Sequence, residues 1–294
     1  MRIGVAGLGK MGAAIAARLI DVGHQVSVWN RSAEKTLPLI ATGATAAKTP
    51  AELASASEIV VTSLTDAAAI DAVYHGASGL LGGDVGGKLF VEMSTLQPGT
   101  SVALAEKVRA KNAGYVECPV GGTVGPAREG KLLGLMGAEA VDAARAKPIL
   151  EQLCRRLEHC GPVGAGSAVK LAVNLPLMVS WQSFGEAFAL CRDVGFEPQR
   201  LLSLFTDISG TTNALKMRAP MLVAMLEGRD PGPITFDIDV ARKDLRTMLA
   251  EAKLRGVELP LVERTLACFD EASRNGLGKQ DGSRLAAYWA TRPQ

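Results

Sequence analysis

Two polar side chains lie four residues apart in an otherwise apolar segment, Lys170 and Asn174 in the run GAGSAVKLAVNLPLMVSW of residues 164–181. Positions four apart share one face of a helix, and Ser167 and Met178 extend the same stripe. The other faces are apolar as well, which predicts a helix buried nearly all round. Removal from water favours the neutral form of a lysine and allows it to exchange a proton near neutral pH. The segment therefore predicts a general acid or base; the alternative is that Lys170 reaches water at an edge and Asn174 only satisfies backbone groups.

A glycine-rich turn near the amino terminus has the spacing GxGxxG, in the run Gly7-Leu8-Gly9-Lys10-Met11-Gly12. An apolar strand-like run precedes it, and an alanine-rich helical pattern follows it. In that setting the first glycine permits a tight turn, the second lets a pyrophosphate approach the backbone, and the third lets the helix pack closely on the sheet. The run predicts a dinucleotide site, and a glycine-rich turn without a ligand is the alternative.

The end of the second strand-like run indicates which dinucleotide is bound. NAD sites usually carry an acidic residue about 20 residues beyond the glycine run, where it binds the ribose 2′-hydroxyl. This chain has Asn30, Arg31 and Ser32 in that region. Asn30 removes the charge that would repel a 2′-phosphate, and Arg31 offers a planar fork for phosphate oxygens. Ser32 adds a hydroxyl and is expected to cap the following helix. These residues favour NADP(H) over NAD(H); the alternative is an ordinary exposed arginine beside a helix cap.

Such a site requires a scaffold of alternating strands and helices in the first half of the chain. Apolar runs predict the strands and helical patterns lie between them, an order that indicates a mostly parallel, doubly wound sheet. The predicted strands span residues 2–6, 25–29, 58–63, 88–92, 115–118, 132–136 and 156–160, and the predicted helices span 11–22, 32–41, 50–56, 66–74, 98–113 and 141–153.

The second half of the chain differs, because almost no alternating stretches follow the glycine-rich residues 161–166. We predict an α/β fold, with an NADP-binding Rossmann domain at residues 1–163 and an all-α domain for substrate binding and oligomerisation at residues 164–294. A long helix joins the two domains. It is predicted over residues 167–193, and further helical periods span 198–207, 212–226, 240–255, 260–274 and 282–291.

The composition excludes several classes of function. The 294 residues suit two domains, and 32 basic against 30 acidic side chains leave a net charge of +2. This balance, with an aromatic content of 4%, argues against nucleic acid as a partner. The five cysteines form no CxxC pair and indicate reduced thiols in the cytoplasm rather than zinc ligands or disulfides. No uncharged apolar stretch of about 18 residues is present, so no membrane span is expected.

Five motifs occur in order along the chain. They are the glycine-rich turn, Met93-Ser94-Thr95 with Pro98-Gly99-Thr100, Pro119-Val120-Gly121-Gly122-Thr123, Gly164-x-Gly166-x-x-x-Lys170-x-x-x-Asn174, and Lys243-Asp244-Leu245. Over essentially its full length, the chain thereby resembles the β-hydroxyacid dehydrogenases. That family includes 3-hydroxyisobutyrate dehydrogenase, tartronate semialdehyde reductase and glyoxylate/succinic semialdehyde reductases.

The resemblance implies a role for each motif. Lys170 would protonate the substrate carbonyl oxygen as hydride arrives from the nicotinamide, and would act as a base on the alcohol in the reverse direction. Asn174 would hold the same oxygen or the substrate carboxylate. Hydride transfer of the kind that the resemblance implies requires no metal. It places Leu64, Thr65 and Thr95 on the nicotinamide side of the cofactor cleft, Lys243 on the cofactor from the helical domain, and Ser94, Gly121, Gly122 and Thr123 around the substrate.

One motif departs from the family pattern. The family commonly has Asp-x-Pro-Val-Ser-Gly-Gly, in which the serine hydroxyl binds the substrate carboxylate, but this chain has Glu117-Cys118-Pro119-Val120 followed by Gly121. The backbone N–H groups of Gly121 and Gly122 can still form an anion nest, and Thr123 is a candidate for the missing hydroxyl. A flexible loop with a repositioned turn is the alternative. The departure leaves the identity of the substrate open.

We therefore predict an NADP(H)-dependent oxidoreductase that interconverts a small 3-hydroxy (or 2- or 4-hydroxy) acid and its semialdehyde or keto acid. One alternative is an imine reductase on the same scaffold, which commonly has another residue type at the position of Lys170. A second is a non-catalytic NADP-binding protein, which would be expected to lack Lys170 or Asn174. A homodimer or homotetramer in the cytoplasm is expected.

Overall fold

The computed structural model describes residues 1–292. The chain divides after Lys170 into two compact units, the first containing a sheet and the second built of helices. The predicted domain boundary, after residue 163, lies just before the long helix inside which this division falls.

The first unit is built on a mostly parallel sheet, as the alternating pattern predicts. Its strands are β1 (Arg2–Ala6), β2 (Gln25–Trp29), β3 (Thr45–Ala46), β4 (Ile59–Thr62), β5 (Leu89–Glu92), β6 (Gly114–Glu117), β7 (Val120–Gly121), β8 (Leu132–Ala138) and β9 (Cys154–Gly161). Their order in the sheet is β3-β2-β1-β4-β5-β6-β8-β7, and β9 pairs with β8. Pairing is parallel from β3 to β6, whereas β8 runs antiparallel to β6 and β7.

This strand order has a topological switch point beside β1. From β1 the chain moves outward to β2 and β3, then returns to place β4 on the other side of β1. The loops that follow β1 and β4 therefore diverge at one edge of the sheet, which is where open α/β sheets bind their ligands.

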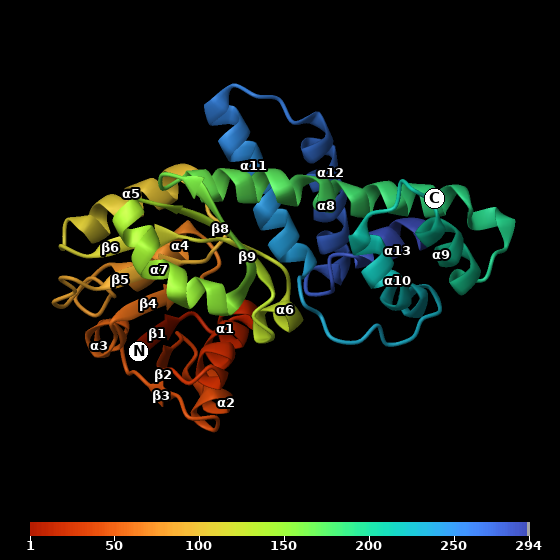
Figure 1. Ribbon diagram of the computed structural model, residues 1–294. Helices are drawn as coiled ribbons and strands as arrows, with labels where there is room; N and C mark the ends of the chain where they lie inside the picture. Colours follow the sequence, from red (N-terminus) through yellow and green to blue (C-terminus); the bar gives the residue numbers. More distant parts are fainter. Residues whose placement is uncertain (293–294) are drawn as a thin grey trace. The chain divides into compact units, whose positions relative to one another are not determined.

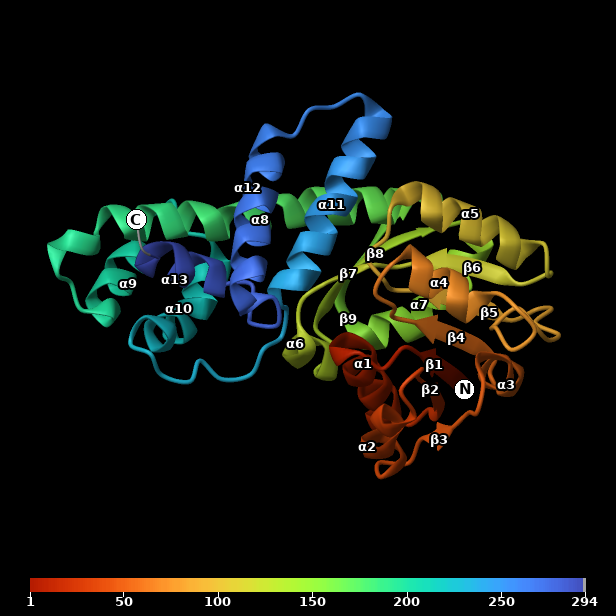
Figure 2. The ribbon, with the colours of Figure 1, turned by 180° about the vertical axis from the view of Figure 1, so that it is seen from behind.

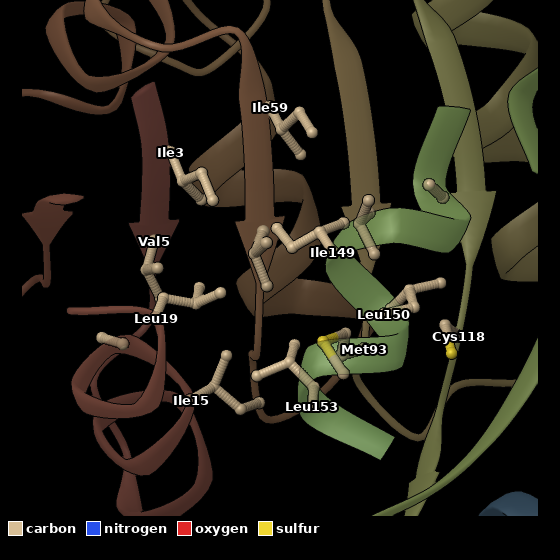
Figure 3. Packing of buried hydrophobic residues seen from close by; sticks show 14 of the residues in the cluster. Ile3, Val5, Ile15, Leu19, Ile59, Met93, Cys118, Ile149, Leu150 and Leu153 are labelled. Atoms are coloured by element: carbon tan, nitrogen blue, oxygen red, sulfur yellow. The ribbon is translucent and has the colours of Figure 1, made fainter. Parts of the chain in front are cut away.

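Helices cover both faces of the sheet, as Figure 1 and Figure 2 show from opposite sides. They are α1 (Lys10–Asp21), η1 (Ala33–Thr36), α2 (Leu37–Ile40), α3 (Pro50–Ala56), α4 (Ala67–Tyr74), α5 (Pro98–Arg109), α6 (Val124–Arg128) and α7 (Ala140–Leu153). Because successive strand residues point to opposite faces, Ile3 and Val5 pack with α1 and α7, whereas Val60 and Phe90 pack with α3, α4 and α5. Figure 3 shows the first of these cores, in which Ile15 and Leu153 approach from the two helices.

Short elements differ from the sequence prediction. Residues 32–41, predicted as one helix, form η1 and α2 instead, because Pro38 lacks the N–H that a continuous helix would use. The predicted cap is wrong as well, since Ser32 makes no side-chain bond to this turn. The elements β3, β7 and α6 were not predicted, because two to five residues show no measurable periodicity.

The second unit is helical, in agreement with the predicted all-α domain. It contains most of α8 (Ala165–Leu190), then η2 (Arg192–Val194), α9 (Pro198–Asp207), α10 (Asn213–Leu226), α11 (Ile238–Arg255), α12 (Pro260–Ala272), the irregular turn η3 (Ser273–Leu277) and α13 (Arg284–Thr291). Its core includes Trp181 and Phe188 of α8, Leu245 of α11 and Phe269 of α12. None of the described helices combines the length and apolarity that crossing a membrane requires.

Helix α8, the long green helix of Figure 1, corrects one expectation. Its predicted burial on all sides is wrong, because Val169 and Val173 are 37% and 47% exposed and Pro176 is exposed beside them. One face of this helix is therefore buried and the other is exposed, although both faces carry apolar side chains. The buried face of its first half carries the polar residues Ser167, Lys170 and Asn174.

Candidate active site

The glycine-rich turn joins β1 to α1 at the switch point. Gly7 has a φ of 92°, which L side chains rarely adopt, and its N–H donates to the carbonyl oxygen of Trp29 at 3.0 Å. A Cβ on Gly12 would overlap the carbonyl oxygen of Gly7, so only glycine allows α1 to start this close to the turn. A Cβ on Gly9 would meet no heavy atom within 4 Å, which leaves that backbone open to a ligand. The turn has the geometry that a pyrophosphate-binding loop requires.

Asn30 braces this turn against the residues that follow β2. Its Oδ1 accepts a hydrogen bond from the N–H of Leu8 at 2.9 Å, and its Nδ2 donates to the carbonyl oxygen of Ser32 at 3.0 Å. Arg31 is exposed, and within residues 1–292 no hydrogen bond or ion pair engages its guanidinium. At the end of β2, the neutral amide of Asn30 thus holds the turn, and the exposed guanidinium of Arg31 lies next to it in the sequence.

A buried network links the loops that follow β4 and β5. Glu92, the last residue of β5, accepts hydrogen bonds from the Thr62 hydroxyl at 2.6 Å, the Tyr74 hydroxyl at 3.3 Å and the Ser94 N–H at 2.8 Å. The Ser94 hydroxyl oxygen in turn accepts from the N–H of Leu64 at 2.7 Å. Glu92 and Ser94 therefore hold Leu64 and its loop at the same edge of the sheet as the glycine-rich turn.

The Glu92 network predicts a pH-dependent stability. Burial raises the pKa of the Glu92 carboxyl, although bonds from Ser94, Thr62 and Tyr74 oppose that shift. The folded protein then keeps this proton to higher pH than the unfolded chain, so raising the pH removes stability, by about 1.4 kcal/mol for each unit of raised pKa. Glu92→Gln keeps a neutral isostere in place. Denaturant titrations between about pH 5 and about pH 8 should show the variant gaining stability relative to the wild type as pH rises. An unchanged difference across that range would contradict the ionisation described here.

The segment 120–123 is partly engaged in the sheet. Gly121 pairs with Leu133 across β7 and β8, and a Cβ on Gly121 would meet only ordinary contacts with that leucine, at 3.5 Å or more. The structure therefore has room for a serine side chain at position 121, and steric crowding does not explain the glycine there. Gly122 is exposed, and Thr123 precedes α6 without a side-chain cap bond.

Lys170 and Asn174 lie one turn apart on the buried face of α8. Their residues are 6% and 8% exposed, and Ser167 and Met178 on either side are buried too. Lys170 therefore does not reach water at an edge, which was the alternative interpretation of the sequence.

Asp244, a motif residue to which the resemblance assigns no role, connects two predicted site residues of the second unit. Its Oδ2 accepts from Nδ2 of Asn174 at 3.2 Å, and its Oδ1 pairs with Nζ of Lys243 at 2.6 Å. The carboxylate is buried, whereas the Lys243 side chain is 27% exposed. The Asp244 side chain thereby helps to orient the amide of Asn174. The motif Lys243-Asp244 was the available signal, because it contains an acid directly beside a predicted site residue.

The structure thus gathers the predicted residues into two sets. The first unit brings the glycine-rich turn, the end of β2 and the loops after β4 and β5, which include Thr65 and Thr95, to the carboxyl edge of its sheet. The second unit joins Asn174 and Lys243 through Asp244. Glu92 was missed, since a single acid at a strand end gives no spacing pattern. Within the described residues, no group of three His, Cys, Asp or Glu side chains is arranged to hold a metal ion.

Comparisons with known proteins agree with this architecture. Residues 2–161 match the model of the NAD binding domain of 6-phosphogluconate dehydrogenase, and residues 164–289 match that of the NAD-binding domain of NADP-dependent 3-hydroxyisobutyrate dehydrogenase. The 2-(hydroxymethyl)glutarate dehydrogenase of Eubacterium barkeri is 30% identical over 98% of this chain and 95% of its own. Glyoxylate/succinic semialdehyde reductase 1 of Arabidopsis thaliana is 30% identical over 97% of both chains. A crystal structure of 3-hydroxyisobutyrate dehydrogenase from Salmonella typhimurium has a TM-score of 0.86 and 25% identity, over 97% of this chain and 99% of that one.

A dinucleotide-binding turn at the switch point of a Rossmann domain, followed by a helical domain, defines an oxidoreductase that uses a nicotinamide cofactor. The matches over nearly the full length are more specific. The chain belongs to the β-hydroxyacid dehydrogenase family and is an NAD(P)-dependent enzyme of that family.

Proposed function

We propose that this enzyme reduces a small carbonyl acid, a semialdehyde or keto acid, to the hydroxy acid with NADP(H), and that the reaction is reversible. The observation that carries the proposal is the buried pair of Lys170 and Asn174 on one face of α8, in a chain whose first unit contains the dinucleotide-binding turn. A proton donor and an amide that are both removed from water suit a carbonyl oxygen that gains negative charge.

The residues of the first unit fit the proposed cofactor. Gly9 offers open backbone for the pyrophosphate at the start of α1, and Arg31 offers its guanidinium for the 2′-phosphate. Leu64, Thr65 and Thr95 lie on the loops expected to face the nicotinamide. When bound, the reduced nicotinamide supplies the hydride that carbonyl reduction requires.

Two glycine variants separate the roles within the turn. Gly12→Ala should destabilise the fold by about 3 kcal/mol or more, because its Cβ would overlap the Gly7 carbonyl oxygen. Gly9→Ala should leave the free energy of unfolding within about 0.5 kcal/mol of the wild type, because its Cβ meets nothing in the protein. It should nevertheless raise the Kd for NADPH about tenfold or more, since the methyl group occupies the path of the pyrophosphate. Denaturant titration and calorimetric titration with NADPH measure the two effects. Wild-type affinity in Gly9→Ala would refute the assigned cofactor position.

In the proposed reaction, the ammonium of Lys170 donates its proton to the carbonyl oxygen, and the resulting amine takes the proton back from the alcohol in the reverse direction. Asn174 donates its amide N–H to the same oxygen or to the substrate carboxylate. Its bond to Asp244 holds the amide in one orientation. Lys243, paired with the same carboxylate, is proposed to contact the cofactor.

The substrate is proposed to be a short acid, by analogy with the names of the relatives. They include a 2-(hydroxymethyl)glutarate dehydrogenase and a glyoxylate/succinic semialdehyde reductase. The carboxylate is assigned to Ser94, to the backbone of Gly121 and Gly122, and to the uncapped hydroxyl of Thr123. The space left by a glycine at 121 suits a carboxylate that binds without a serine hydroxyl. Exposed apolar side chains of the second unit, such as Leu254 and Leu261, support the expected homodimer or homotetramer.

Oxidation of NADPH against a panel of substrates tests the proposal. Glyoxylate and the succinic, tartronic and methylmalonic semialdehydes should each be compared with cyclic imines of similar size. Turnover of at least one carbonyl acid, and none of the imines, is expected. Preferential turnover of imines would favour the imine reductase alternative, and tight NADPH binding without turnover of any compound would favour a non-catalytic protein.

A further inference from the structure

A buried carboxylate at the end of β6 holds the start of α8. Glu117 is the last residue of β6 and is 1% exposed. Its Oε1 accepts hydrogen bonds from the N–H groups of Gly164 at 2.6 Å and Ser167 at 3.2 Å, and its Oε2 accepts from the Ser167 hydroxyl at 2.6 Å. Three donors from the first turn of the helix and the residue before it thus converge on one acid.

Two glycines allow this close approach. Gly137 lies opposite Glu117 in the pairing of β6 with β8, and a Cβ on it would overlap Oε1 of that carboxylate. A Cβ on Gly166 would overlap the carbonyl oxygen of Leu135 on β8. The start of α8 therefore lies directly against the sheet, and the longer side chain of a glutamate fits where the family commonly has an aspartate.

We propose that Glu117 is a positioning residue for Lys170. Ser167 precedes Lys170 by three residues, about 4.5 Å along the helix axis, so the bonds to Ser167 fix both the height and the rotation of the turn that carries the amine. A misplacement of about 1 Å at a catalytic group can lower turnover about 10²-fold. This inference rests on the proposed function, in which Lys170 is the proton donor.

Three variants and a matched control test the proposal. Glu117→Ala leaves three donors without their acceptor, whereas Glu117→Gln keeps the size of the side chain, an oxygen for the two N–H groups and an amide that donates to Ser167. Ser167→Ala removes one bond of the three. The control is Asp142→Ala. Asp142 is also a buried acid that ties a helix to β6, through the Tyr115 N–H at 3.1 Å, but it belongs to α7 and not to α8.

Glu117→Ala should lower kcat about 10- to 100-fold while the Kd for NADPH stays within about twofold. Glu117→Gln should retain most of the wild-type kcat. Asp142→Ala should lower Tm but leave kcat unchanged. Wild-type kcat in Glu117→Ala, or an equal loss in Glu117→Gln, would overturn the proposal. If Glu117→Ala does not fold, Ser167→Ala decides: a several-fold lower kcat at unchanged Kd supports the proposal, and an unchanged kcat overturns it.

Hydrogen exchange separates this inference from the proposed function. Amides of residues 165–170 should exchange faster in Ser167→Ala and Glu117→Ala than in Asp142→Ala, whether or not the wild type turns over a carbonyl acid. Faster exchange with an inactive wild type would reject the proposed function and leave the contact at Glu117 standing. Unchanged exchange together with an active wild type would reject the positioning role alone.

Discussion

Replacing Lys170 by methionine is expected to lower kcat for carbonyl reduction about 10²- to 10⁴-fold, the range that one general acid contributes. Methionine preserves the apolar packing of the buried stem but has no proton to donate, so the carbonyl oxygen would gain charge without a partner. The Kd for NADPH should change little, because the glycine-rich turn and Arg31 are intact. Steady-state kinetics and a calorimetric titration of the same preparation measure both quantities.

Val169→Ala is the matched control for that experiment. Val169 precedes Lys170 on α8, but its side chain is on the exposed face of the helix. The alanine variant should therefore keep wild-type kcat. Turnover in Lys170→Met that equals that of Val169→Ala would remove Lys170 from the mechanism.

Arg31→Ala is expected to weaken the binding of NADPH selectively and to raise the KM for NADPH about 10- to 100-fold. The reason is that charge-assisted bonds to a phosphate contribute about 1.5–3 kcal/mol. The KM for NADH should change far less, since that cofactor has no 2′-phosphate. The ratio of kcat/KM for the two cofactors is the measurement that isolates this effect from any general loss of binding.

Lys35→Ala provides the comparison for Arg31. Lys35 is an exposed cation in η1, a few residues beyond Arg31, and contributes to the same general positive potential. Its removal should change the KM for NADPH and the KM for NADH by about the same factor. If Arg31→Ala also affected both equally, the 2′-phosphate contact would be refuted.

Long periodic elements were predictable from the sequence. The strands around the glycine-rich turn and the helix that carries Lys170 have strong patterns, and the structure has them within a few residues of the predicted bounds. Residues 32–41 were mispredicted because a helical pattern does not reveal how Pro38 divides the segment. The exposed face of α8 was missed because Val169 and Val173 have the same apolar character as the buried residues beside them.

The supporting acids were the least predictable part of the candidate site. Glu92 and Glu117 are paired at the ends of β5 and β6; Glu92 accepts from Ser94 in the loop after β5, and Glu117 accepts from Ser167 at the start of α8. Their roles depend on which backbone groups the fold brings to them, and neither periodicity nor motif spacing contains that information. Asp244 was present in a motif, but its bond to Asn174 joins residues 70 positions apart.

Transfer of deuterium from labelled NADPH tests the central claim most directly. The wild type and Lys170→Met should each be incubated with NADPH deuterated at the transferred position and with the carbonyl acid that the wild type turns over fastest. We expect mass spectrometry to find deuterium on the carbinol carbon of the hydroxy acid formed by the wild type, and almost no product from Lys170→Met. Labelled hydroxy acid formed equally fast by both proteins, or by neither with any carbonyl acid of the panel, would contradict the account.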